Sequence, residues 1–238
     1  MPTVAHVTFA AHGDPPLRLE GRLHRAKAGI PPAGSCVLLH PHPVFRGSMD
    51  TWLIARIAER LAEEGWIVLR FNFRGVGASE GSSSDGTGEL LDLLGALAFV
   101  DKVTGAIPGG RGESPPTPGG RGRSAHRVAV VGWGFGALVG LLLAECQVRV
   151  TDWVGIAPPT RHLKAIPMVD PPYRALPSWP ARRCVIVGEC DVLYPPGLVA
   201  TLDPDVVHVM PGADHFMADR CEEVAAVVCR ALKREEIP

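Results

Sequence analysis

The segment from Arg127 to Glu145 constrains the fold more than any other part of the chain. It reads RVAVVGWGFGALVGLLLAE, which is a run rich in β-branched residues, a turn with glycine at alternate positions, and a long apolar stretch. β-Branched residues favour strands, and glycine allows sharp turns and close approach of two backbones. The segment therefore predicts a buried strand that turns abruptly into a buried helix.

Two other interpretations fit this segment less well. A membrane-spanning helix needs about 20 apolar residues, whereas the uncharged run from Val128 to Ala144 is shorter and is interrupted by glycines. A dinucleotide-binding turn follows the pattern G-x-G-x-x-G, whereas Gly132, Gly134 and Gly136 follow G-x-G-x-G. We therefore favour neither a membrane span nor a nucleotide site here.

The composition indicates a globular protein. Hydrophobic residues make up 46% of the 238 residues and charged residues 21%, which suits a single globular domain over residues 1–238. The net charge of −1 argues against a nucleic-acid partner. The N-terminus lacks a basic segment followed by an apolar one, and the six cysteines form no C-x-x-C pair. We therefore expect a cytoplasmic protein with reduced thiols and no membrane partner.

Strand-like and helix-like segments alternate along the chain. Near the N-terminus, Val4 to Phe9 and Leu17 to His24 resemble two strands with a turn between them. Further strands are expected at 36–39, 66–71, 128–133, 150–157, 184–187 and 206–210, with helices at 53–65, 90–100, from 137 and at 218–233. This alternation predicts an α/β fold with a mostly parallel central sheet, helices on both faces and an antiparallel N-terminal hairpin.

Two segments interrupt the alternation. Residues 105–124 contain PGGRG twice and too few apolar residues to pack, so we expect a disordered surface insertion. The segment from Pro158 to Pro180 holds seven prolines. Because it follows the carboxyl end of a predicted strand, where α/β sheets place their sites, we expect it to border the functional site.

Residues with catalytic chemistry follow three of the predicted strands. The turn after 128–133 has the frame of the nucleophile elbow G-x-S-x-G, but Gly134 stands in the place of the serine. Asp191 and His215 each follow a later strand. The order elbow, acid, histidine is that of the α/β-hydrolase triad. We therefore expect His215 to act as the general base and Asp191 to orient it.

Two motifs extend this likeness. They are LHPHP at 39–43, followed by GSMD at 47–50, and RFNFRGVGAS at 70–79. They resemble a small α/β-hydrolase family with the pattern LHPHP…FNFRGVGxSxG, which is similar to dienelactone hydrolases and serine aminopeptidase-like hydrolases. The resemblance covers nearly the whole chain outside 105–124 and implies the α/β-hydrolase fold. In that family the elbow reads GFSFG, so this chain departs from it at Gly134, whereas Asp191 and His215 match.

The resemblance also implies an oxyanion hole made of two backbone N–H groups. One donor should come from the loop after 36–39 and the other from the residue after the elbow position, which is Phe135. Because proline has no N–H, His42 is the expected donor in the loop, with Val44 as the alternative.

His40 and His42 also have the spacing of half a metal site. No third ligand follows by spacing, so we expect no metal, and we expect no cofactor. Asn72 and Ser79 are polar residues of the second motif, and we expect them to form turns rather than take part in catalysis.

Glycine at position 134 preserves the turn but removes the hydroxyl that covalent catalysis requires. We favour the hypothesis of a binding or regulatory protein that takes a small ester-like or acyl ligand. A second hypothesis is a hydrolase of esters, thioesters or peptides in which Asp191 and His215 activate water, or deprotonate a substrate. A third is a substitute nucleophile. The candidates for that role are Cys190, Ser48 and Ser79.

Overall fold

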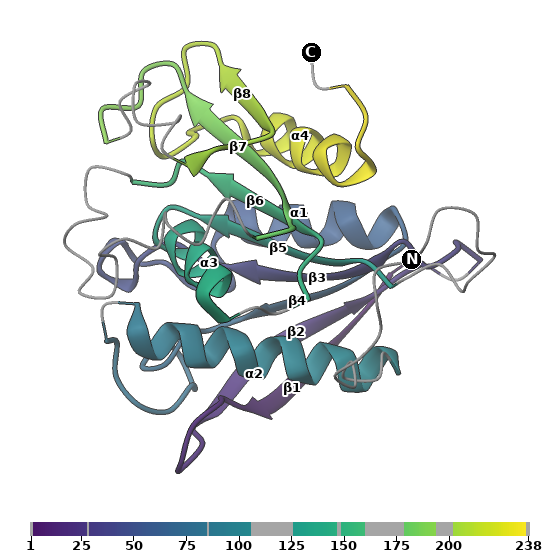
Figure 1. Cartoon of the computed structure of the whole chain (residues 1–238), viewed down its shortest axis with the longest axis vertical. Coiled ribbons are helices and arrows are strands. Elements are labelled where there is room, and N and C mark those ends of the chain that lie inside the picture. Colours follow the sequence, from purple (N-terminus) through teal and green to yellow (C-terminus); the bar gives the residue numbers. More distant parts are fainter. Residues whose placement is uncertain are drawn as a thin grey trace.

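The structure is a computed structural model that describes residues 2–27, 29–84, 86–105, 126–146, 149–159, 179–193 and 202–236. Its centre is an eight-stranded sheet in the order β1-β2-β4-β3-β5-β6-β7-β8 (Figure 1). The strands are β1 (Thr3–Ala10), β2 (Arg18–Arg25), β3 (Gly34–Leu39), β4 (Trp66–Phe71), β5 (Val128–Trp133), β6 (Asp152–Ile156), β7 (Arg182–Gly188) and β8 (Val206–Met210).

The sheet has the predicted mixture of strand directions. β1 and β2 form an antiparallel hairpin at one edge, and β2 is also antiparallel to β4. The pairs from β4 through β3 to β8 are parallel. The chain runs from β3 to β4, which pairs with β3 on one side. The next strand, β5, pairs with β3 on its other side, so the direction in which strands are added reverses here. Such a reversal of strand order opens a crevice beyond the carboxyl ends of the two strands, which here are β3 and β5.

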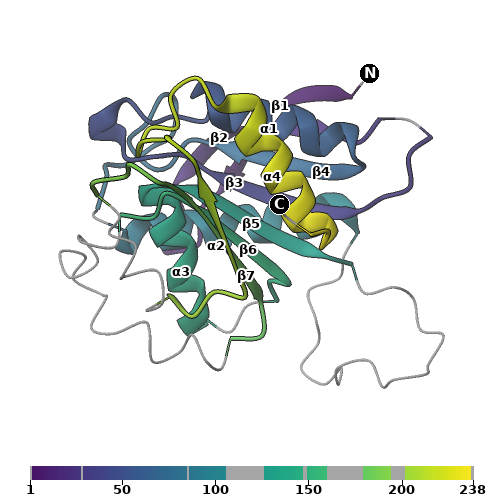
Figure 2. The same ribbon diagram turned by 90° about the horizontal axis from the view of Figure 1, so that it is seen from above.

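Helices cover both faces of the sheet, as Figures 1 and 2 show. One face carries α1 (Trp52–Glu63) and α4 (Cys221–Lys233), and the other carries α2 (Thr87–Thr104) and α3 (Phe135–Cys146). Helix α1 is amphipathic, and the residues of its buried face recur every three or four positions: Leu53, Ile54, Ile57, Ala58, Leu61 and Ala62. β3 and β5 are buried at every residue because helices lie on both sides of them.

Helices α2 and α4 each begin three residues away from the predicted start, and α3 begins at Phe135, two residues before the predicted 137. Helix α2 begins at Thr87 instead of residue 90, because the Glu89 carboxylate accepts the N–H of Gly86 at 2.9 Å and caps an extra turn. Helix α4 begins at Cys221 instead of residue 218. Met217 and Asp219 have φ values of 52° and 57°, which lie in the left-handed region and cannot continue a right-handed helix.

Two of the predicted segments fall largely outside the description. The insertion predicted at 105–124 lies outside the described residues except for Gly105, and so do residues 160–178 of the proline-rich segment. Within the described ranges, no helix combines the length and the apolar character that a bilayer span requires.

Candidate active site

Asp191 and His215 meet at the carboxyl ends of β7 and β8. Nδ1 of His215 lies 2.9 Å from Oδ2 of Asp191, and Oδ1 of the same carboxylate accepts the N–H of Leu193 at 2.8 Å. The Asp191 side chain is fully buried, and that of His215 is 13% exposed. Because an ionised carboxylate only accepts hydrogen bonds, Nδ1 carries the proton of the neutral imidazole. Nε2 is then left unprotonated, as a general base requires.

Gly134 lies opposite that nitrogen, at the turn between β5 and α3. Its N–H donates to the carbonyl of Ile156 at 2.8 Å, and its φ is 55°. A Cβ built on Gly134 would lie 3.9 Å from Nε2 of His215 and 3.9 Å from Cβ of Pro41, which is ordinary van der Waals separation. An oxygen attached to such a carbon could approach Nε2 within hydrogen-bonding distance. The fold therefore brings Gly134, His215 and Asp191 into the arrangement of a triad.

The expected oxyanion-hole donors lie beside Gly134. Phe135 is the first residue of α3, so its N–H has no partner within the helix. The N–H of His42 donates to no residue in the described ranges, whereas the N–H of Val44 donates to Nδ1 of His42 at 3.1 Å. The imidazole of His42 packs edge-on against the Phe135 ring at 4.7 Å. His42 is thus better placed than Val44 to donate from this loop.

His40 fixes the start of the same loop. Its Nδ1 is 2.7 Å from the carbonyl oxygen of Pro41, and its Nε2 accepts the N–H of Phe73 at 3.1 Å. Burial lowers the pKa of His40 to about 4, because the charged imidazolium would lose its hydration. Both ring nitrogens are engaged, so His40 offers no lone pair to a metal. The described part of the chain holds no group of three or more His, Cys, Asp or Glu side chains that could bind a metal ion.

Asn72 and Ser79 brace the second motif. Asn72 accepts the N–H of Met49 at 2.7 Å and donates to the Glu20 carboxylate at 2.7 Å. The Ser79 hydroxyl donates to the carbonyl oxygen of Asn72 at 2.7 Å. Both side chains are thus fully occupied in holding loops against the sheet.

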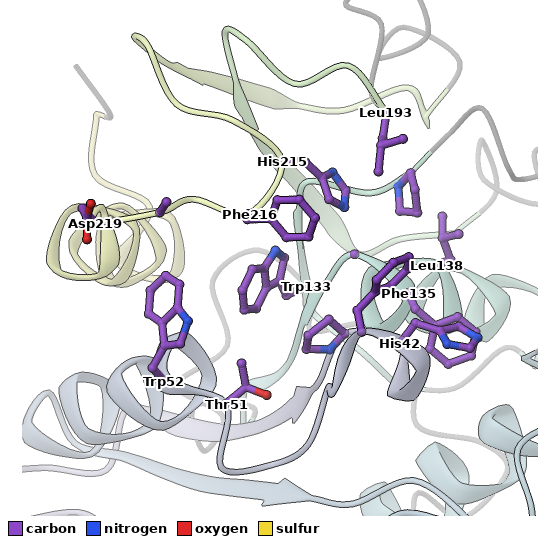
Figure 3. Close-up of a pocket in the computed structure, with 15 residues that line it drawn as sticks. His42, Thr51, Trp52, Trp133, Phe135, Leu138, Leu193, His215, Phe216 and Asp219 are labelled. Atoms are coloured by element: carbon purple, nitrogen blue, oxygen red, sulfur yellow. The ribbon is translucent and has the colours of Figure 1, made fainter.

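Gly134 lines a cavity of about 780 Å³. Figure 3 shows the labelled side chains around this cavity, among them His215, Trp133 and Phe135. Most of its walls are apolar, and Trp52 and Trp133 meet edge-to-face at 5.6 Å on one side of it. Its lining is formed by Pro41, His42, Phe45, Thr51, Trp52, Trp133, Gly134, Phe135, Leu138, Pro159, Leu193, His215, Phe216, Ala218 and Asp219. Of these, Phe45, Trp52 and Phe216 are wall residues that sequence reasoning missed. Their one signal is that each is a large aromatic residue close in sequence to a motif residue.

Comparison with known proteins identifies the superfamily. No family model matches the chain. An uncharacterized protein of Rickettsia prowazekii (strain Madrid E), RP471, is 28% identical over 221 residues, which is 89% of this chain and 82% of that protein. The structure of an α/β serine hydrolase homologue from Coxiella burnetii is 27% identical, with a TM-score of 0.72 over 94% of this chain and 96% of that one. XC6422 from Xanthomonas campestris, an α/β serine hydrolase without a lid, is 24% identical, with a TM-score of 0.74 over 99% and 97% of the two chains.

The chain belongs to the α/β-hydrolase superfamily.

The elbow of this α/β-hydrolase-fold protein has two glycines that its packing requires, Gly132 and Gly136, and one that it does not, Gly134. A Cβ on Gly132 would lie 2.4 Å from the backbone nitrogen of Ala137, and a Cβ on Gly136 would lie 2.4 Å from the carbonyl oxygen of Leu39. Both neighbours are backbone atoms, which cannot move aside without shifting a strand or a helix. At Gly134 no atom of a described residue obstructs a side chain, and the obstacle is the positive φ.

The three alternative nucleophiles lie elsewhere in this α/β-hydrolase-fold protein. None of them is among the described residues that line the cavity. Cys190 is exposed, the Ser48 hydroxyl accepts the N–H of Asp50 at 3.2 Å, and the Ser79 hydroxyl is engaged as described above. The geometry therefore gives no support to a substitute nucleophile from this set.

Alanine substitutions should separate the elbow glycines by their effect on stability. We expect Gly134→Ala to cost about 1–2 kcal/mol, the usual cost of a left-handed backbone for a residue with a Cβ. Gly132→Ala and Gly136→Ala should each cost more, because they add a backbone clash. Urea unfolding of the three variants measures the order. Equal costs at the three positions would contradict this account of the elbow.

Acid should weaken the fold through His40. The pKa of this residue is about 4 in the folded protein and about 6.5 in an unfolded chain. Between those values the unfolded state binds a proton that the folded state does not, so stability falls as the pH drops through this window. The loss from this one residue amounts to about 3 kcal/mol at most.

The free energy of unfolding, measured with urea at several pH values between 4 and 7, should therefore depend less steeply on pH in His40→Gln than in the parent. His24, whose pKa burial also lowers to about 4, should keep a residual slope in the variant. An unchanged slope in His40→Gln would mean that His40 does not titrate in this way.

Proposed function

We propose that this α/β-hydrolase relative binds a small ester-like or acyl ligand above Gly134 and does not form an acyl-enzyme. One observation carries the proposal: the residue that faces Nε2 of His215 has no side-chain oxygen. A covalent intermediate needs a nucleophile at that point. Thr51 carries the only hydroxyl in the described cavity lining, and its oxygen accepts the N–H of Ser48 at 3.0 Å.

The cavity itself favours binding. Its volume of about 780 Å³ falls within the range of small-molecule sites, which is roughly 300–1,000 Å³. Apolar walls surround a small polar group made of His215 and the N–H groups of His42 and Phe135. Such a site has the features that fix the orientation of a carbonyl compound, and occupancy of the site rather than turnover would be the biological output.

A second candidate is hydrolysis by water that His215 activates. It is favoured by the 2.9 Å contact between His215 and Asp191, which leaves Nε2 facing the open side of Gly134. Nε2 would take a proton from water as the water oxygen attacks the carbonyl carbon, and the resulting oxyanion would accept from the two backbone N–H groups. The imidazolium would then return its proton to the departing alkoxide. Triads that lack one member keep up to ~10³-fold catalysis over water.

Restoring the hydroxyl should restore covalent chemistry. We expect Gly134→Ser to react with a fluorophosphonate probe, because the new oxygen would lie within reach of Nε2 of His215. The parent and Gly134→Ala should not react. Gly134→Ala is the matched control, because it has the same backbone strain as Gly134→Ser but no side-chain oxygen. The double variant Gly134→Ser/His215→Ala should also stay unlabelled. A folded Gly134→Ser protein without labelling would show that the triad geometry is not functional.

An ester panel distinguishes the two candidate functions. Under the binding function, hydrolysis of p-nitrophenyl esters and acyl thioesters by the parent should equal that by His215→Ala, since neither forms an acyl-enzyme. Initial rates at equal protein concentrations provide the comparison. Activity in the parent that falls at least 10-fold in His215→Ala would instead establish the water-activated route.

A further inference from the structure

We propose that the ligand of this cavity is an apolar monocarboxylic acid, bound as its carboxylate directly over Gly134. One carboxylate oxygen would accept from the N–H groups of Phe135 and His42. The other would occupy the space of the missing serine side chain and accept from Nε2–H of protonated His215. The inference rests on the proposed binding function and names the chemical class of the ligand.

The space beside Gly134 is the first argument. A Cβ built on this residue would lie 3.9 Å from Nε2 of His215 and 3.9 Å from Cβ of Pro41. The glycine therefore leaves room for an additional atom between its Cα and these two side chains. In a serine hydrolase the serine oxygen fills this space. Here a ligand oxygen can take that position and satisfy Nε2.

The charges around the cavity floor are the second argument. His215 can carry a positive charge because Asp191, fully buried and 2.9 Å away, stabilises its cation. Helix α3 adds the positive end of its dipole at Phe135, and its first turn contains no acidic side chain to neutralise it. An anionic ligand is therefore favoured at this end over a neutral ester or amide.

The remaining walls limit the body of the ligand. Trp52, Trp133, Phe216 and Leu138 line the cavity with apolar surface. Figure 3 shows Trp52 on one side of Trp133 and Leu138 on the other. Figure 3 shows Asp219 on the far side of Trp52 from Phe135, and Asp219 forms no ion pair with any described residue. A second carboxylate at that end would face the like charge of the exposed Asp219 side chain. The cavity thus selects an acid with one carboxylate and an apolar aliphatic or aromatic chain.

Calorimetry with matched ligands tests the inference. Octanoate and 3-phenylpropionate serve as acids, octanamide and 3-phenylpropionamide as neutral analogues, and octanedioate as the dicarboxylate. We expect the acids to bind at least 10-fold more tightly than the amides and octanedioate to bind more weakly than octanoate. Titration of octanoate in buffers of different ionisation enthalpy should reveal proton uptake, because His215 becomes protonated in the complex.

Substitutions in the cavity test where the carboxylate of the ligand binds. Gly134→Ser should weaken octanoate binding at least 10-fold, since the serine side chain fills the space of one ligand oxygen. His215→Ala should abolish the proton uptake and weaken octanoate binding by a similar factor. Cys190→Ser, which alters an exposed residue outside the cavity lining, should bind octanoate like the parent.

The outcomes separate this inference from the proposed function. Amides that bind as tightly as the acids, or octanoate binding without proton uptake, would overturn the carboxylate inference and leave the binding function standing. Absence of binding by both classes would overturn the inference as well. Turnover of esters that depends on His215 would overturn the proposed function, whatever the affinity for acids.

Discussion

The first turn of helix α3 approaches the end of strand β3 so closely that only glycine fits between them. The Cβ that Gly136 lacks would lie 2.4 Å from the carbonyl oxygen of Leu39. This contact fixes the N-terminus of α3 beside the loop that follows β3, and β3 and β5 pair in parallel with Leu39 opposite Gly132. The two backbone segments that flank the cavity floor therefore hold one geometry, with or without a side chain at position 134.

Preservation of the histidine–aspartate pair has a structural reason as well as a chemical one. Asp191 is fully buried, and an ionised carboxylate in such a place requires partners. His215 and the N–H of Leu193 supply them, and the first of these contacts joins the loops after β7 and β8. Glycine at position 134 leaves this network intact, because the carboxylate needs no side chain from that position to be satisfied.

Much of the fold could be predicted because its signals are local. β5 reads VAVVGW and is buried throughout, and α1 places its apolar residues on one face, so burial follows directly from sequence pattern. The start of α2 could not be predicted, because it depends on the buried Glu89 carboxylate capping the backbone of Gly86. The start of α4 depends on left-handed residues such as Asp219, which carry no distinctive sequence signal.

The candidate site could likewise be predicted from the sequence only in part. Gly134, Asp191 and His215 could be placed near one another because each follows a parallel strand, and the carboxyl ends of such strands share one edge of the sheet. The cavity walls could not be derived in this way. Trp52 comes from α1 and Phe216 from the loop after β8, and only the packed fold shows that these aromatic side chains face the same space.

The exposure of the cysteines makes one of them, Cys190, suitable for attaching a fluorescent label near the cavity. Cys190 is the exposed cysteine, whereas Cys36, Cys184 and Cys229 are buried and Cys146 and Cys221 are half-buried. Burial raises the pKa of the Cys184 and Cys229 thiols to about 11, which suppresses the thiolate that alkylating dyes attack. A maleimide fluorophore would therefore attach preferentially at Cys190, next in sequence to Asp191, and could signal ligand entry in real time without any engineered cysteine.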